Sequence, residues 1–306
     1  MKHALGGLIA APFTPFRPDG SVALETVPRL AQLLTSNGVS GAFVCGTTGE
    51  GYSMSTDERK QVAMAWRKSA PAGLKIIVHV GHSSAVEGRE LARHAQEIGA
   101  DAISTIAPSF FKPPTAVELV AWCREVASAA PGLPFYYYHL PSMTGVTLPT
   151  VDFLREADGK IPTLAGIKFT YEDLEDFRAA SIFGGGRYDI LFGRDEILLQ
   201  GLQLGAPGAV GSTYNYASPL YRGIMQAFSS GNLALAEREQ AKARKFIDVM
   251  VAAGGLPAGK TIMKFVGVDC GPVRLPLRNL TKAEEEKLRA DLAAQGFFDF
   301  ASKLTA

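Results

Sequence analysis

Short apolar runs alternate with amphipathic stretches along most of this chain. The eight runs lie at residues 8–11, 42–45, 76–80, 102–106, 135–138, 164–168, 190–192 and 209–210. Continuous apolar strands that alternate with helices are typical of a parallel sheet with both faces covered. Eight such units predict an α/β fold, a closed (β/α)8 TIM barrel, because a doubly wound open sheet, the alternative, normally uses fewer strands.

Helix boundaries are marked between the runs. In the capping-box pattern, a serine or threonine precedes a glutamate by three positions. This pattern occurs at residues 55 and 58, 84 and 87, and 115 and 118. After Tyr216 the pattern is helical alone, at 217–229, 232–253, 257–267 and 281–295. We therefore expect a barrel at residues 1–230 and, packed on it, a C-terminal helical extension at residues 231–306.

The composition excludes several classes of function. A net charge of +1 gives no electrostatic case for nucleic acid or an anionic membrane surface. The three cysteines are far apart, which suits a reducing compartment and gives no metal-ligand spacing. Residues 4–13 faintly resemble a signal peptide, but Pro12 and Pro15 interrupt the run, so we expect a first strand there. No apolar run reaches the roughly 18 residues of a transmembrane helix, and we expect a cytoplasmic protein.

One lysine lies inside an apolar strand. Lys168 is near the end of the sixth run, and because side chains on a strand alternate, Gly166 and Lys168 face one side and Ile167 the other. Burial disfavours the charged form of an amine, and a neutral amine can attack a carbonyl to form a Schiff base. The alternative is a strand-end lysine whose ammonium group is solvated.

Polar and glycine-rich segments follow the runs. In a (β/α)8 barrel the active site lies at the C-terminal ends of the strands, where these segments would meet. They are residues 46–51, 138–141, 168–170, 193–196 and 211–215. We therefore expect a functional site at this end of the barrel.

Two of these segments have a chemical and a structural interpretation. Thr47 and Thr48 lie between glycines, where hydroxyl and backbone N–H groups can bind a carboxylate, but a tight turn explains the same glycines. Tyr138 follows Tyr136 and Tyr137 at a strand end, where one hydroxyl can carry a proton. The alternative is that the tyrosines fill barrel and helix interfaces, which we expect for two of the three.

Residues 254–261 match the phosphate-loop pattern G-x-x-x-x-G-K-T. That motif binds nucleotides only between a strand and a helix, and residues 234–251 have the composition of a helix. We therefore expect a helix–helix turn at these glycines and no nucleotide site.

Four motifs together resemble the pyruvate-dependent class I aldolases, the family of N-acetylneuraminate lyase and dihydrodipicolinate synthase. They are Gly-Thr-Thr-Gly-Glu at 46–50, Tyr138 before Leu-Pro, Gly-Ile-Lys at 166–168, and Gly-Ser at 211–212. The resemblance runs from Leu8 to about Phe297. Within the family, residues 136–145, 166–174, 192–196 and 211–215 are similar to the N-acetylneuraminate lyase branch, particularly its animal members.

The resemblance implies a mechanism without metal or organic cofactor. Lys168 would form a Schiff base with the C2 ketone of an open-chain 2-keto acid. Tyr138 would take the C4 hydroxyl proton, and Thr47 and Thr48 would hold the carboxylate. The products would be pyruvate and N-acetylmannosamine from a sialic acid substrate.

The resemblance also implies a binding site for the polyol tail of the substrate. Its residues would be Thr170, Gly193, Asp195, Glu196 and Ser212. Carboxylates accept hydrogen bonds from sugar hydroxyls. Acidic residues at a helix N-terminus also favour the helix dipole, and both interpretations of the acid pair can hold together.

Two positions depart from relatives within the family. Met143 stands where the synthase branch has an arginine, which disfavours that branch. Phe110 and Phe111 stand near the place of a tyrosine that often enters a neighbouring subunit's site, so a relay of two tyrosines through Thr47 is in doubt. The resemblance implies a homotetramer, a dimer of dimers. The alternatives are an aldolase for another 2-keto-3-deoxy sugar acid, a synthase-like enzyme and a non-catalytic pyruvate-binding protein.

Overall fold

The computed structural model describes residues 5–304 and has eight parallel strands closed into a barrel. The strands follow chain order around the barrel, and β8 pairs with β1 through Gly7 and Gly208. They are β1 (Gly7–Ala10), β2 (Gly41–Val44), β3 (Lys75–His79), β4 (Ala102–Ile106), β5 (Phe135–His139), β6 (Leu164–Phe169), β7 (Asp189–Phe192) and β8 (Gly208–Gly211). The predicted (β/α)8 barrel is therefore confirmed, and the open sheet is excluded.

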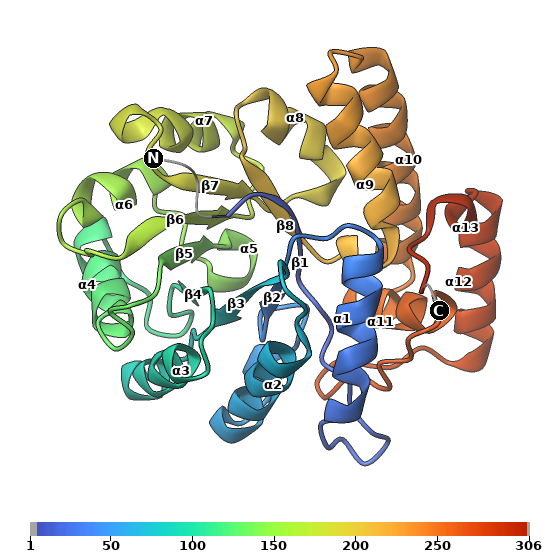
Figure 1. Ribbon diagram of the computed structural model, residues 1–306, viewed down its shortest axis with the longest axis horizontal. Coiled ribbons are helices and arrows are strands. Elements are labelled where there is room, and N and C mark those ends of the chain that lie inside the picture. Colours follow the sequence, from blue (N-terminus) through green and yellow to red (C-terminus); the bar gives the residue numbers. More distant parts are fainter. Residues whose placement is uncertain (1–4, 305–306) are drawn as a thin grey trace.

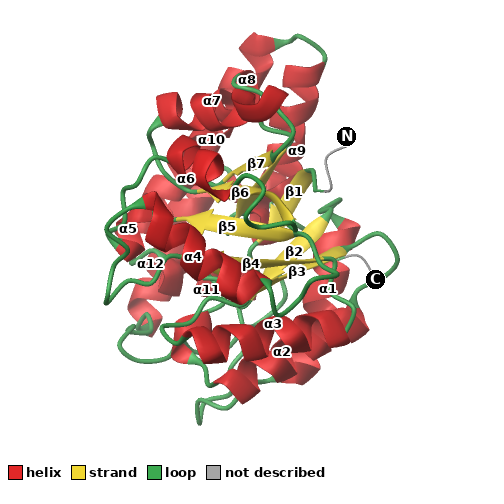
Figure 2. Cartoon of the chain, turned by 90° about the vertical axis from the view of Figure 1, so that its left-hand side faces the viewer, coloured by secondary structure: helices red, strands yellow, loops and turns green. Residues whose placement is uncertain are grey.

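Helices surround the strands on all sides of the barrel (Figures 1 and 2). Those up to the eighth unit are α1 (Val27–Ser36), α2 (Thr56–Ser69), α3 (Ala85–Glu97), α4 (Ala116–Ala127), α5 (Pro141–Thr144), α6 (Thr150–Ala157), α7 (Leu174–Ile182), α8 (Leu198–Gln203) and α9 (Tyr214–Ser229). Four short 3-10 helices are η1 (Leu24–Thr26), η2 (Gly51–Ser53), η3 (Phe183–Gly185) and η4 (Asp195–Ile197).

The helix starts predicted after Ser55, Ser84 and Thr115 are correct, with two differences in detail. Ser55 and Glu58 form a reciprocal capping box at the start of α2, and Thr281 and Glu284 form another at the start of the helix Lys282–Ala294. The Ser84 hydroxyl accepts from Glu87 N, but the Glu87 carboxylate accepts from Thr56 Oγ1 and the box is not reciprocal. At α4 the Thr115 hydroxyl instead accepts from the backbone N–H of Val117. A threonine hydroxyl that bonds two residues ahead forms a local turn, so the reciprocal box is incomplete there.

The chain beyond the barrel forms α10 (Leu233–Ala252), α11 (Leu256–Phe265), α12 (Lys282–Ala294) and α13 (Phe297–Phe300), drawn orange to red at one side of Figure 1. α10 packs along α9, and its Phe246 contacts the rings of Tyr216, Tyr221 and Phe297. The predicted helix–helix turn lies between α10 and α11, where Gly254 has a positive φ of 117°.

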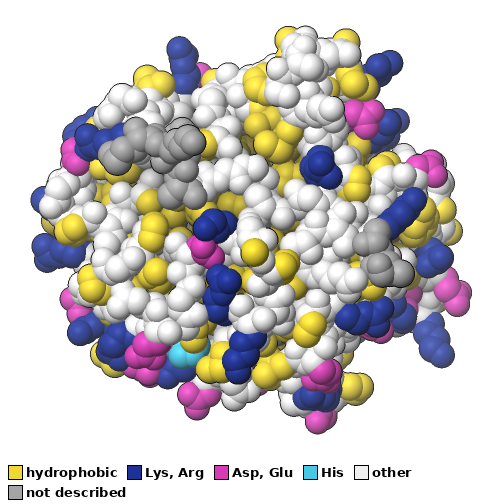
Figure 3. All heavy atoms as spheres, in the orientation of Figure 1, with side chains coloured by type: hydrophobic (Ala, Val, Ile, Leu, Met, Phe, Trp, Pro, Cys, Tyr) yellow, Lys and Arg dark blue, Asp and Glu magenta, His cyan; other side chains and the backbone are white. Residues whose placement is uncertain are grey.

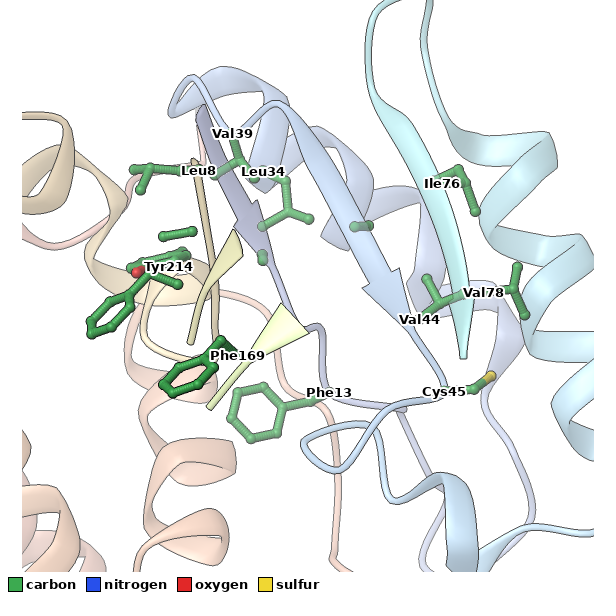
Figure 4. Close-up of a cluster of buried hydrophobic side chains, with 14 of the residues drawn as sticks. Leu8, Phe13, Leu34, Val39, Val44, Cys45, Ile76, Val78, Phe169 and Tyr214 are labelled. Atoms are coloured by element: carbon green, nitrogen blue, oxygen red, sulfur yellow. The ribbon is translucent and has the colours of Figure 1, made fainter. Parts of the chain in front are cut away.

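Two apolar layers result from the alternation of side chains. Phe43, Ile77, Tyr138 and Leu191 fill the barrel interior. Side chains of the opposite strand faces, including Ile167, pack against the helices, and Figure 4 shows part of this outer layer. The predicted orientation of β6 is confirmed, because Ile167 belongs to the outer layer and the Lys168 amine lies against interior rings.

The distribution of charged side chains on the surface agrees with the net charge of +1. Basic and acidic side chains are interspersed over the face drawn in Figure 3. Within residues 5–304, no single helix has the length and apolarity to cross a membrane. The bent pair of α10 and α11 meets that test by length and composition only.

Candidate active site

A cavity of about 210 Å³ opens among the loops that follow the strands. All nine site residues expected from the sequence line it, namely Lys168, Tyr138, Thr47, Thr48, Thr170, Gly193, Asp195, Glu196 and Ser212. They come from the ends of β2, β5, β6, β7 and β8. The structure therefore brings these residues together as the barrel rule predicts.

Lys168 lies in the barrel interior and is 4% exposed. Its Nζ is 3.9 Å from the ring centroid of Tyr138 and 4.1 Å from that of Phe43. None of the ion pairs between residues 5–304 involves this amine. The side chain of Lys168 also lines the cavity. The amine is therefore placed to react with a carbonyl group that enters the cavity.

A tyrosine hydroxyl lies beside this amine. Tyr138 on β5 pairs with Lys168 on β6, and its hydroxyl is 3.4 Å from the Thr47 Oγ1 atom. Tyr136 lies elsewhere in the interior and donates to Asp189 Oδ2 at 2.7 Å. Tyr137 points outward and stacks near Phe153. The expectation that two of the three tyrosines fill packing space is confirmed.

The loop after β2 forms a tight turn around Thr47 and Thr48. The backbone N–H of Glu50 donates to Thr47 O, and that of Gly51 donates to Gly46 O, each at 3.0 Å. The turn thus presents the two threonine side chains to the cavity next to Lys168. Such a turn with hydroxyl groups can bind an anion.

Acidic side chains line the opposite part of the cavity. Asp195 is buried, and its Oδ2 accepts hydrogen bonds from Thr213 N at 3.1 Å and Thr213 Oγ1 at 2.6 Å. The backbone oxygen of Asp195 accepts from Gln240 Nε2 on α10 at 3.0 Å. Glu196 is more exposed and pairs with Arg194 at 3.2 Å. The Asp195 carboxylate is therefore fixed in place, whereas the side chain of Glu196 is 34% exposed.

Two glycines make room for these polar groups. A Cβ atom at Gly211 would lie 1.9 Å from Asp195 Oδ1, and one at Gly193 would lie 2.0 Å from Thr170 Oγ1. Real Cβ atoms do not approach so closely, so any larger residue would displace the polar side chain. The close approach of neighbouring strands therefore explains Gly193, whether or not a ligand touches it.

Sequence reasoning missed part of the cavity wall. Ile247, Met250 and Val251 of α10 line the cavity. It also missed the surroundings of His79, whose Nδ1 lies 3.2 Å from Cys45 O beside the Tyr138 ring. Burial lowers the pKa of His79 well below its usual value. For the α10 residues of the cavity wall, the apolar positions of the helix are the available sequence signal, and they do not indicate which surface the helix covers.

The cavity is suited to an anionic organic molecule with several hydroxyl groups. Its lining contains the amine of Lys168, the hydroxyls of Thr47, Thr48 and Tyr138, and the carboxyl groups of Asp195 and Glu196. Within the described part of the chain, no three His, Cys, Asp or Glu side chains converge as metal ligands.

The stability of the protein should depend on pH through Asp195. Burial raises the pKa of this carboxyl from its ordinary 3.8 to about 6. The carboxyl thus favours folding below its ordinary pKa, and this contribution is lost as the pH rises through about 6. Asp195→Asn should therefore stabilise the fold at about pH 8, by up to about 3 kcal/mol, and the gain should shrink towards about pH 5. Urea unfolding of both proteins measures the gain, and a gain that is equal at both pH values contradicts this origin.

Comparisons with known proteins agree with this geometry. The sequence profile of the dihydrodipicolinate synthetase family matches residues 4–295. The N-acetylneuraminate lyase of Mus musculus is 43% identical over 301 residues, covering 97% of this chain and 94% of that protein. The solved N-acetylneuraminate lyase of Proteus mirabilis is 43% identical, with a TM-score of 0.93, covering 96% and 99% of the two chains. A structure described as a catalytic lysine mutant of Ruminococcus gnavus sialic acid aldolase is 28% identical, with a TM-score of 0.90, covering 97% and 98%.

Proposed function

The chain belongs to the dihydrodipicolinate synthetase family, and from this membership and the cavity around Lys168 we propose that it cleaves N-acetylneuraminate to N-acetylmannosamine and pyruvate. The printed names of the relatives at about 42–43% identity, which are N-acetylneuraminate lyases, support the substrate. The observation that carries the chemistry is the buried Lys168 amine, which shares its cavity with the Tyr138 hydroxyl and the Thr47–Thr48 turn.

The proposed reaction begins with a Schiff base. Lys168 Nζ adds to the C2 ketone of the open-chain sugar acid, water leaves, and an iminium ion forms. The Tyr138 hydroxyl gives its proton to the departing water and, as the phenolate, then takes the proton of the C4 hydroxyl. The C3–C4 bond then breaks, its electron pair moves toward the iminium nitrogen, and C4 becomes the aldehyde of N-acetylmannosamine. A proton returns to C3, and water releases pyruvate from Lys168.

The two ends of the cavity suit the two ends of this substrate. Thr47 and Thr48 would hold the carboxylate through hydroxyl and backbone N–H groups, next to the reacting amine. Asp195 and Glu196 would accept hydrogen bonds from the hydroxyls of the polyol tail, with Ser212 as a further partner. Thr170 and Gly193 would line the path between the two ends.

Met143 argues against a synthase-like reaction. The side chain of Met143 lines the cavity and is 66% exposed. A second anionic substrate would need a cation near this position, and a thioether supplies none. An aldolase for another 2-keto-3-deoxy sugar acid would share the lysine chemistry and differ in recognition of the tail.

The test of the proposed function is release of pyruvate from N-acetylneuraminate. We expect pyruvate and N-acetylmannosamine in equal amounts, without added metal and in the presence of a chelator. A panel of 2-keto-3-deoxy sugar acids of different length, assayed in parallel, tests which polyol tail the enzyme recognises. A higher kcat/KM for another sugar acid in the panel would replace the proposed substrate, and no release from any of them would overturn the proposal.

The family resemblance supports two further features. We propose that the protein is cytoplasmic and assembles as a homotetramer. Its three cysteines are all unpaired, and the rings of Phe110 and Phe111, at 82% and 84% exposure, offer an apolar surface that a second copy would cover. Light scattering that gives the mass of a monomer would contradict the assembly.

A further inference from the structure

Among the ion pairs between residues 5–304, the pair of Lys260 and Glu50 is buried. Lys260 Nζ lies 2.8 Å from Glu50 Oε1, and the two side chains are 2% and 1% exposed. In every other ion pair between residues 5–304 that the structure resolves, both side chains are at least 19% exposed. Replacing a buried ion pair with apolar residues often costs a protein nothing, so stability alone does not explain it. We therefore ask which parts of the fold the buried ion pair holds together.

The two charges join segments that are 210 residues apart in the sequence. Glu50 ends the Thr47–Thr48 turn after β2, whereas Lys260 lies on α11 of the C-terminal extension. Each side chain also bonds a backbone group of one nearby segment. Lys260 Nζ also donates to Pro272 O at 2.6 Å, and Glu50 Oε2 accepts from Arg274 N at 2.8 Å. The ion pair therefore fixes the end of the turn to the extension.

The turn itself has an unfavourable backbone conformation. Within residues 5–304, the non-glycine residues with positive φ are Cys45, at 59°, and Glu50, at 54°, and they flank the turn. Such residues cost energy and persist only where surrounding contacts hold them. Space is also short, because a Cβ at Gly51 would lie 2.0 Å from Cys45 O. Contacts from outside hold the turn in this conformation. The buried ion pair at Glu50 is one of them, beside the hydrogen bond that Thr14 Oγ1 donates to Gly49 O at 2.6 Å.

We propose that Glu50 and Lys260 are positioning residues, whose ion pair holds the Thr47–Thr48 turn in the shape that binds the substrate carboxylate. This inference rests on the proposed function, in which that turn receives the carboxylate. Neither Glu50 nor Lys260 lines the cavity, so the pair acts through the turn and does not touch the substrate. It also explains the lysine of the phosphate-loop pattern at 254–261, whose amine is committed to Glu50.

The test removes each charge with a side chain of similar size. Glu50→Gln and Lys260→Met should raise the KM for N-acetylneuraminate by about tenfold or more and change kcat by less than about threefold. The reason is that the carboxylate is bound alike in the ground state and the transition state. The pyruvate concentration that half-saturates borohydride trapping on Lys168, read by intact-protein mass spectrometry, should rise by the same factor.

Two further variants separate positioning from stability. Each single variant leaves a buried charge unpaired, whereas Glu50→Gln/Lys260→Met leaves none and stays folded if a single variant does not. Its KM should be as high as that of the single variants. Lys264→Met is the matched control, because Lys264 lies on the same helix as Lys260. The substitution breaks an exposed ion pair with Glu285 of α12, and its KM should equal that of the wild type.

The outcomes distinguish this inference from the proposed function. A folded double variant whose KM and half-saturating pyruvate concentration stay within about threefold of the wild type overturns the positioning role. If the wild type traps pyruvate on Lys168 but does not cleave N-acetylneuraminate, the proposed substrate fails and trapping still tests the turn. If the wild type does not trap pyruvate at all, the proposed function fails, and the inference fails with it.

Discussion

Lys168→Ala should abolish the release of pyruvate from N-acetylneuraminate, with a fall in kcat of more than about four orders of magnitude. The variant lacks the only group in the described cavity that can form a Schiff base with the keto acid. Without the iminium ion, the electron pair of the breaking bond has no acceptor. Continuous detection of pyruvate measures the loss, and intact-protein mass spectrometry after borohydride reduction should find an adduct in the wild type alone.

A second substitution at this position is the control for packing. Lys168→Met keeps most of the volume between the Phe43 and Tyr138 rings, so the fold should remain while activity is lost. Circular dichroism and thermal unfolding verify the fold of both variants. Measurable cleavage by a folded Lys168→Met protein would rule out the Schiff-base mechanism.

Tyr138→Phe should lower kcat by about a hundredfold or more, because removal of a general base typically costs that much. KM should change little, since the phenyl ring still packs against Phe43 and the Lys168 amine. The substitution also removes the hydroxyl group that lies 3.4 Å from Thr47 Oγ1, and Thr47 still lines the cavity. Steady-state kinetics of cleavage measures both constants.

The matched control is Tyr136→Phe. This residue lies on the same strand face two positions earlier, and its hydroxyl bonds Asp189 instead of lining the cavity. We expect Tyr136→Phe to reduce stability and to leave kcat near the wild-type value. Equal losses of kcat in the two variants would show that Tyr138 has no special role in proton transfer.

The sequence predicted the barrel and the meeting of the strand ends because both depend on local patterns. Continuous apolar runs mark strands that are covered on both faces, and the alternation of side chains places Gly166 and Lys168 inside. Once the barrel is accepted, the ends of its strands must meet, so Thr47, Tyr138 and Asp195 lie around one cavity. Their chemical roles rest on the family resemblance and on the experiments described above.

The contributions of the C-terminal extension could not be predicted in this way. Glutamate and lysine usually lie on the surface, so nothing about Glu50 or Lys260 alone indicates burial. No local pattern indicates that these two residues, 210 positions apart, pair in the interior. Met250 belongs to a helix that the sequence predicts at residues 232–253, but the sequence does not indicate which surface that helix covers. Gly193 was assigned to the substrate, whereas its tight contact with Thr170 is visible only in three dimensions.

The wall that α10 contributes to the cavity has a practical consequence for protein engineering. Ile247, Met250 and Val251 face the cavity from a helix that supplies none of the reacting groups. A library randomised at these three positions would alter the space for the sugar tail and leave the amine, the tyrosine and the anion-binding turn intact. Selection from such a library offers a route to aldolases that make new sugar acids from pyruvate and unnatural aldehydes.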